Sequence, residues 1–379
     1  MKAKVPSSRK ARRFVLIAGA IALLALALCA CTEPGNQTTR ADSGQETERS
    51  VTDAYGRTVH VPKEVETVAT VGSGARFVVY AGGQDKLVAV TEMEYPAAPS
   101  RPYTVVHQDL FSTLPTTSNG NHLMETTVDT EKLLEINPDV IVSSRSAEEC
   151  DALQESIGIP VVGISYQGQL FTENVYASIE AVGQAVGTED HARQVVTKLK
   201  EWKEDLSERT ASIPDDQKPR VYVGAVNFKG AKSFTGTYAH YPVLDAINAK
   251  NVADESGQKG AFDTTLEQIG TWDPDIMFLN AGNMELLKKD FGDNPAFFNE
   301  LQAFKNKRLY SQPSFNFNGT NVEMGICDAY FCASVVYPDR FSDIDLPARY
   351  DEIFTVMLGS PYYDTMKSSG ADFKPISIG

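Results

Sequence analysis

From residue 51 onward, short apolar runs alternate with amphipathic segments. Continuous apolar runs are typical of strands buried on both faces of a parallel sheet, and amphipathic segments are typical of covering helices. The sequence therefore predicts an α/β fold. A small hairpin with Gly56 in its turn is expected over residues 51–59. The predicted strands are 67–72, 87–92, 139–144, 161–165, 220–226, 275–280 and 308–311.

One pattern occurs twice, in segments that begin 136 residues apart at Glu131 and Glu267. In each segment a short helix opens on the glutamate, meets a Pro-Asp pair, and is followed by a buried strand. Proline ends such a helix because it lacks an N–H donor and disfavours helical geometry in the residue before it. The repeat predicts two related lobes rather than a solenoid of short units.

A single long helix is predicted between the two copies of the repeat. Apolar residues recur at helical spacing from Ala192 to Leu206, and the other faces are charged. Thr188 is the expected N-cap. Twenty-odd helical residues span roughly 30–35 Å, enough to join two lobes, although a surface helix of one lobe has the same pattern. The predicted boundaries are 51–187 for the first lobe, 188–213 for the connecting helix and 214–379 for the second lobe.

The N-terminus has the features of an export signal. Six basic residues and no acid precede an apolar run from Phe14 to Leu28, which is short for a membrane span. The run ends in a Leu-Cys-Ala-Cys sequence at 28–31 that resembles the lipobox of bacterial lipoproteins. The resemblance implies a signal peptide over 1–30 and lipidation of Cys31, followed by a polar tether over 31–50. An unlipidated signal peptide or anchor is the alternative.

The charge balance excludes one class of partner. The chain has 50 Asp and Glu against 35 Lys and Arg, a net charge of −15. Cleavage before Cys31 would remove six positive charges and bring the net charge to −21. Nucleic acid is therefore not an expected partner, because phosphate binding relies on clustered basic residues. Cys150, Cys327 and Cys332 are expected to be buried thiols rather than a disulfide or a metal site.

Together these features resemble the iron-complex and cobalamin substrate-binding proteins of ABC transporters. The resemblance is carried by the 51–59 opening, the Val88–Val90 strand after residues 84–86, the doubled Glu-x6-Pro-Asp segments and the lipobox. Residues 314–323 and 351–363 are similar to a subgroup that binds iron complexes. The resemblance implies two Rossmann-like lobes, one rigid connecting helix and a ligand cleft between the lobes. It also implies that Glu131 and Glu267 meet arginines of a permease dimer, although each glutamate equally suits its own helix N-terminus.

Candidate ligand residues follow the predicted strands, because ligands meet the carboxyl ends of strands in open α/β lobes. Arginine, aromatic and amide side chains in these loops would suit an anionic iron chelate. Arg76 is as well suited to a structural ion pair. The candidates are Ser73, Arg76, Glu92, Tyr95, Arg101, Tyr103, Asn121 and Arg145 in the first lobe, and Tyr238, Tyr241, Asn280 and Phe315 in the second.

The expected function is capture of a solute and its delivery to an ABC permease at the outer face of the cell membrane. The five histidines have no zinc-ligand spacing, so a bare metal ion and a resident cofactor are not expected. No nucleophile elbow, phosphate-binding loop or zinc-protease motif occurs, which favours a binding protein over an enzyme. A siderophore-type iron chelate is the expected ligand, and cobalamin or another corrinoid and haem are the alternatives.

Overall fold

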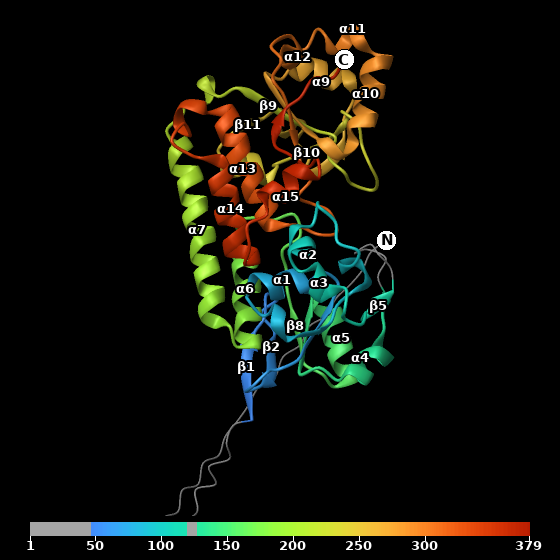
Figure 1. Cartoon of the computed structure of the whole chain (residues 1–379). Helices are drawn as coiled ribbons and strands as arrows, with labels where there is room; N and C mark the ends of the chain where they lie inside the picture. The colour runs from blue at the N-terminus through green and yellow to red at the C-terminus, as the bar shows by residue number, and fades with distance from the viewer. Residues whose placement is uncertain (1–46, 120–126) are drawn as a thin grey trace, which may run out of the picture. The chain divides into compact units, whose positions relative to one another are not determined.

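The computed structural model of the chain describes residues 47–119 and 127–379 (Figure 1). The described residues form one compact unit. Two α/β lobes, each built on a parallel sheet, are joined by one long helix, as the sequence predicts. The predicted signal peptide and Cys31 lie outside the described residues.

The first lobe is built on a four-stranded sheet in the order β4-β3-β7-β8, with every neighbouring pair parallel. Strands β3 and β7 are buried along their whole length, which explains their uninterrupted apolar sequences. The strands are β3 (Val68–Val71), β4 (Leu87–Ala89), β7 (Val140–Ser143) and β8 (Val161–Gly163). The helices are α1 (Gly74–Tyr80), α2 (Pro102–Val106), α3 (Gln108–Phe111), α4 (Thr130–Ile136), α5 (Ala147–Ile157) and α6 (Glu173–Val186).

The second lobe has a five-stranded sheet in the order β11-β9-β13-β14-β15, parallel except for its last strand. The strands are β9 (Arg220–Gly224), β11 (Lys250–Asn251), β13 (Ile276–Asn280), β14 (Leu309–Gln312) and β15 (Lys374–Pro375). The helices are α8 (Pro242–Ala246), α9 (Leu266–Trp272), α10 (Met284–Asp293), α11 (Pro295–Phe298), α12 (Gln302–Lys305), α13 (Val322–Val336), α14 (Leu346–Leu358) and α15 (Tyr363–Ser368).

Three two-stranded ribbons complete the described sheets. The predicted N-terminal hairpin pairs β1 (Glu48–Thr52) with β2 (Thr58–Pro62), and Gly56 in its turn has a φ of 76°. The other two ribbons pair β5 (Ser118–Asn119) with β6 (Thr127–Val128), and β10 (Gly236–Ala239) with β12 (Gly260–Asp263).

The doubled Glu-x6-Pro-Asp segment forms the predicted helix and buried strand in both lobes, α4 with β7 and α9 with β13. The C-cap of each helix is the residue before the proline, Asn137 or Asp273, and both residues have a positive φ. The preceding residue avoids the right-handed helical region because of the proline ring, so the left-handed cap is the physical form of the predicted stop.

The connecting helix α7 (Glu189–Ala211) packs against α6 of the first lobe and against α13 and α14 of the second (Figure 1). Its buried residues include Ala192, Val195, Leu199, Trp202 and Leu206, as the spacing predicts. Thr188 is the N-cap residue of the helix, as predicted, but its hydroxyl makes no capping hydrogen bond.

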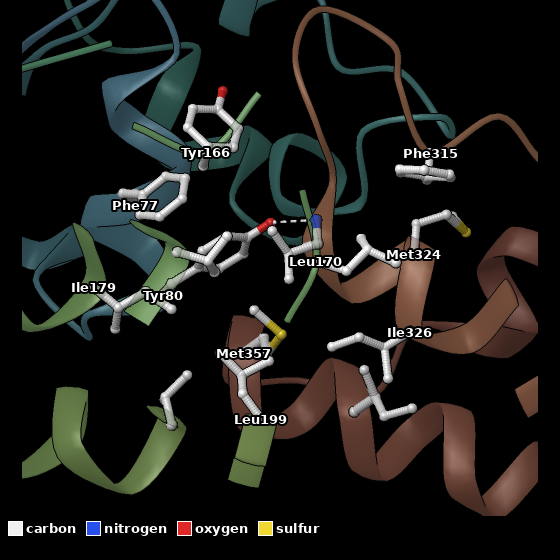
Figure 2. Close-up of a cluster of buried hydrophobic side chains, with 14 of the residues drawn as sticks. Phe77, Tyr80, Tyr166, Leu170, Ile179, Leu199, Phe315, Met324, Ile326 and Met357 are labelled. Atoms are coloured by element: carbon white, nitrogen blue, oxygen red, sulfur yellow. Dashed lines mark hydrogen bonds between the residues drawn. The ribbon is translucent and has the colours of Figure 1, made fainter. Parts of the chain in front are cut away.

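One hydrophobic core runs through α1, α6, α7, α13 and α14 and so belongs to both lobes. Figure 2 shows Phe77 and Tyr80 of α1 in the same cluster as Leu170, Met324 and Met357. The three predicted thiols, Cys150, Cys327 and Cys332, are buried and free of disulfides. The predicted strand 87–92 is shorter than expected, because residues Glu92–Glu94 form a 3-10 turn.

Candidate solute-binding site

A cavity of about 450 Å3 lies at the carboxyl ends of the second-lobe strands β9, β13 and β14. This edge of an open α/β sheet is where ligands gather, and the volume falls in the range of about 300–1,000 Å3 usual for small-molecule sites. Ser100 brings the first lobe to the same cavity. Its lining residues are Ser100, Asn227, Asn280–Asn283, Pro313, Ser314, Phe317 and Ser369–Ala371.

The cavity wall offers amide and hydroxyl groups and one aromatic ring. The side-chain amide of Asn283 donates to the Ala225 carbonyl at 3.0 Å and to Asn227 Oδ1 at 2.6 Å, which fixes the loop after β9. Asn280 Oδ1 accepts from the Gly282 amide at 3.0 Å. None of these lining residues, all within the described ranges, carries a charged side chain. The wall therefore offers hydrogen-bonding groups and one ring rather than charged groups.

Phe317 connects this cavity to a predicted arginine. Its ring is 37% exposed and lines the cavity, and the Arg101 guanidinium lies 6.0 Å from the ring centre. Arg101 itself is buried, donates to the Met93 and Pro96 carbonyls, and lies 3.6 Å from the Glu94 carboxylate. Arg101 thus stands behind the cavity wall and does not line it.

Arg76 is the centre of a second group of candidate residues, at the carboxyl edge of the first-lobe sheet. Its guanidinium lies 4.8 Å from the ring centre of Tyr103 and 5.7 Å from that of Tyr166. Nη1 donates to the Tyr166 hydroxyl at 2.7 Å, and that hydroxyl also hydrogen-bonds Ser73. These side chains are fully buried. The structure therefore brings Ser73, Arg76 and Tyr103 together, inside the protein.

Burial controls the ionisation of this group. It raises the pKa of the Tyr166 phenol, and burial together with Glu94 raises the pKa of the Tyr103 phenol. Burial also raises the pKa of the Glu94 carboxyl, and the charge of the Arg101 guanidinium offsets part of this rise. The Tyr103 hydroxyl donates to Glu94. The two phenols remain protonated at neutral pH and act through hydrogen bonds rather than as anions.

In the second lobe, three predicted aromatic residues form a chain of ring contacts. Tyr241 lies 5.6 Å from Tyr238 and 5.6 Å from Phe315, measured between ring centres. Tyr241 and Phe315 are buried, and Tyr238 is partly exposed. The Tyr241 hydroxyl accepts from Gln312 Nε2 at 3.0 Å. Of the four second-lobe candidates, only Asn280 lines the cavity.

The remaining first-lobe candidates that the structure describes are more exposed than the Arg76 group. Glu92 is exposed, and Tyr95 is 52% exposed. Arg145 is partly exposed, with Nη1 3.7 Å from the Glu149 carboxylate. Asn121 lies outside the described residues.

Glu131 and Glu267 occupy equivalent places, in the first turns of α4 and α9, and both are exposed. The capping bonds of these helices come from other side chains, Asp129 in α4 and Thr265 in α9. The two glutamates are thus not needed as caps, although their charges favour the helix N-termini.

One group among the described residues has metal-ligand geometry. Ligand atoms of His240, Asp245 and Asp254 lie within 4.8 Å of one another. Burial, and then the charge of Asp254, raises the pKa of Asp245. His240 and Asp245 are exposed, and the group lies away from the lining of the cavity.

Sequence reasoning missed several residues that define these sites. Phe317 lies in the 314–323 segment but was not selected, and Tyr166 follows β8 just as Ser73 follows β3. A rule that takes every polar residue within three positions of a strand end would have found Tyr166. No sequence signal identifies Glu94 as the buried partner of Tyr103.

Comparison with known proteins places these sites in context. A substrate-binding lipoprotein of an ABC transporter from Bacillus subtilis, YvrC, is 26% identical over 86% of this chain and 97% of its own. The Fe(3+)-citrate-binding protein YfmC of the same organism is 21% identical over 48% of this chain and 55% of its own. The crystal structure of the Haemophilus influenzae molybdate-binding protein MolA matches with a TM-score of 0.63 and 19% identity, over 83% of this chain and 99% of its own.

These relatives confirm the expectation of a binding protein rather than an enzyme, because substrate-binding proteins of ABC transporters hold a solute without converting it. Over the described ranges 47–119 and 127–379, no helix is long and apolar enough to cross a bilayer. The periplasmic binding protein family model matches residues 68–314, which include both parallel sheets up to the end of β14. The chain is a member of the periplasmic binding protein family.

Proposed function

We propose that this protein captures a chelated iron complex between its lobes and delivers it to an ABC permease. The observation that carries the proposal is the cavity at the ends of β9, β13 and β14. It stands at the ligand edge of the sheet, and Ser100 and Phe317 bring the two lobes to it. The name of the relative YfmC, a Fe(3+)-citrate-binding protein, supports this class of solute.

The chemistry of the cavity wall and of the Arg76 group suits a chelate rather than a bare ion. Iron presented by the cavity's amides and hydroxyls alone would lack anionic ligands, so the metal must arrive already coordinated. The carboxylate or other anionic oxygens of a chelate would find Arg76 on the first lobe, and uncharged hydrogen-bonding groups on the second.

Delivery rests on the two exposed glutamates. Glu131 and Glu267 belong to different lobes and present one carboxylate each at matching helix starts. Charge pairs at two separated points would fix the orientation of the protein on a permease and raise the rate of encounter more than the affinity.

The proposed location is the outer face of the cell membrane, with lipid attached at Cys31 and residues 31–50 as the tether. The name of the relative YvrC, a substrate-binding lipoprotein, supports the anchor. Within the compact unit we assign 51–187 to the first lobe, 188–213 to the connecting helix and 214–379 to the second lobe.

A titration with Fe(III)–citrate tests the proposed solute. The wild-type protein, purified in detergent, should bind it, and Asn280→Ala should weaken binding about tenfold because the Asn280 amide forms part of the cavity wall. Asn299→Ala, the same change at an exposed position that lines no part of the cavity, is the matched control. Equal affinity in the Asn280 and Asn299 variants would contradict the assignment of the site.

A further inference from the structure

Residues 316–320 of the second lobe, here named the plug loop, lie against the first lobe. The carbonyl oxygen of Asn318 accepts a hydrogen bond from Arg76 Nη2 at 3.0 Å. Thr320 Oγ1 accepts from the Gly168 amide at 2.6 Å and donates to Asn316 Oδ1 at 2.9 Å. An antiparallel bridge between Asn316 and Thr320 closes the loop on itself. The loop is thus a compact unit held by the first lobe.

The plug loop covers the carboxyl edge of the first-lobe sheet. Ser73 follows β3 and Tyr166 follows β8, and both flank the place where Asn318 meets Arg76. In open α/β sheets this edge is the ligand edge. The second lobe has a cavity at the carboxyl edge of its sheet. In the first lobe the plug loop fills the equivalent position.

Arg76 carries a charge that the plug loop does not balance. Its side chain is fully buried, and among the described residues no carboxylate oxygen lies within 4 Å of it. Its Nε makes no hydrogen bond. Glu94 and Glu323 favour its charge from beyond 4 Å without a direct ion pair, and a hydrogen bond to an anionic oxygen is about twice as strong as one to a neutral carbonyl. An anionic oxygen in the place of the Asn318 carbonyl would therefore bind better.

We propose that the plug loop occupies the first-lobe half of the solute site, and that anionic oxygens of the solute displace it from Arg76. This inference rests on the proposed function of solute capture. The solute binds only when the plug loop is out, so its apparent affinity is lowered by the fraction of molecules in which the loop is seated. Ser73 and Tyr166, exposed by the same movement, complete the polar half-site.

Gly319 provides the means of testing the plug loop. A Cβ atom there would lie 2.5 Å from Tyr166 Oη and 2.7 Å from Arg76 Nη1, and the φ of +91° is one that other residues rarely adopt. Gly319→Ala should therefore unseat the loop. Gly359 has a similar φ of +81° with no atom within 4 Å, so Gly359→Ala carries the same backbone penalty without the clash. Thr320→Val is a gentler second variant, since it removes both hydroxyl hydrogen bonds.

Arginine modification by phenylglyoxal, read at Arg76 by peptide mass spectrometry, reports the position of the loop without any solute. In the full chain in detergent, Arg76 should resist modification in the wild type and in Gly359→Ala. It should react at least fivefold faster in Gly319→Ala and Thr320→Val, with unchanged circular dichroism. Equal protection of Arg76 in all four proteins would overturn the proposal.

Titration of the same four proteins with Fe(III)–citrate separates this inference from the proposed function. Unseating the loop should tighten binding about fivefold in Gly319→Ala and Thr320→Val, but not in Gly359→Ala. If Arg76 becomes reactive while the affinity stays the same, the loop does not compete with the solute and the inference fails. If no protein binds Fe(III)–citrate, the chelate assignment fails, and the reactivity of Arg76 still decides whether the loop masks it.

Discussion

The hydroxyl of Tyr80 hydrogen-bonds the carboxylate of Glu323 and so joins α1 of the first lobe to the first turn of α13. The same hydroxyl accepts from the Val322 amide at 3.2 Å, the bond drawn in Figure 2. Both side chains are fully buried. The two lobes are thus connected by a polar contact inside their shared core as well as by α7.

Tyr80→Phe should destabilise the protein by about 2–3 kcal/mol, because it removes two buried hydrogen bonds and leaves Glu323 without its partner. Denaturant unfolding measures the change. Tyr337→Phe is the control, since that hydroxyl makes one bond to the Asn248 carbonyl at a partly buried site, and it should cost about 1 kcal/mol or less. Equal stability of the two variants would contradict the role of the contact.

Asp328 should make the stability depend on pH. It is fully buried on α13, neither carboxylate oxygen has a hydrogen-bond partner, and burial raises its pKa well above the ordinary value. The unfolded chain ionises this carboxyl near pH 4, whereas the folded protein holds it protonated. The stability from the protonated form is therefore fully present below about pH 4. It is lost at up to about 1.4 kcal/mol per pH unit as pH rises toward the folded pKa.

Asp328→Asn removes this titration. The free energy of unfolding of the variant, measured in urea, should therefore rise relative to that of the wild type as pH rises from 4.5 to 8. Asp343→Asn is a control of opposite sign. Its hydrogen bond to Arg209 lowers the pKa of Asp343, so the stability this carboxylate contributes is lost as pH falls. A constant difference between Asp328→Asn and wild type across this range would show that Asp328 ionises normally in the folded protein.

The lobes should move little when solute binds. The hydrophobic core is continuous through α1, α7, α13 and α14, and closed packing of this kind resists large rotations. Small-angle scattering of the free and solute-saturated protein should give nearly the same radius of gyration. A lobe rotation of tens of degrees would contradict this expectation and require the shared core to separate.

Loss of Glu131 and Glu267 should separate binding from transport. The double change to alanine should leave solute affinity unaltered, because neither residue lines the cavity, and should abolish uptake into proteoliposomes that hold the cognate permease. Alanine at Glu135 and Glu285, two exposed glutamates on other parts of α4 and on α10, is the matched control. Weakened solute binding in the double variant would assign the glutamates to the site instead.

Most of the architecture could be predicted from the sequence. Uninterrupted apolar runs located β3, β7 and β13, and the doubled Glu-x6-Pro-Asp segment identified the two lobes, because strand burial and helix stops are encoded locally. Helix-capping chemistry at Thr188 was not predictable in the same way, since it depends on how the chain enters α7.

The candidate site was harder to predict, because it depends on contacts between distant residues. Arg76 and Asn318 are separated by 242 positions, and one sequence contains no record of which distant residues meet. The positions of Arg76, Tyr103 and Arg101 after β3 and β4 were found. The expected loops were wrong for Arg76 and Tyr103, which lie in α1 and α2, and the burial of all three behind Tyr166, Glu94 and Phe317 was not predicted. Asn280 was both found and placed at the cavity.

Native mass spectrometry combined with visible absorbance, on protein purified from iron-replete cells without added solute, tests the central claim most directly. The account predicts a bound species whose mass is that of an iron chelate, with a charge-transfer band from iron coordinated by anionic oxygens. A corrinoid or haem spectrum, or the mass of a bare oxyanion such as molybdate, would contradict capture of a chelated iron complex.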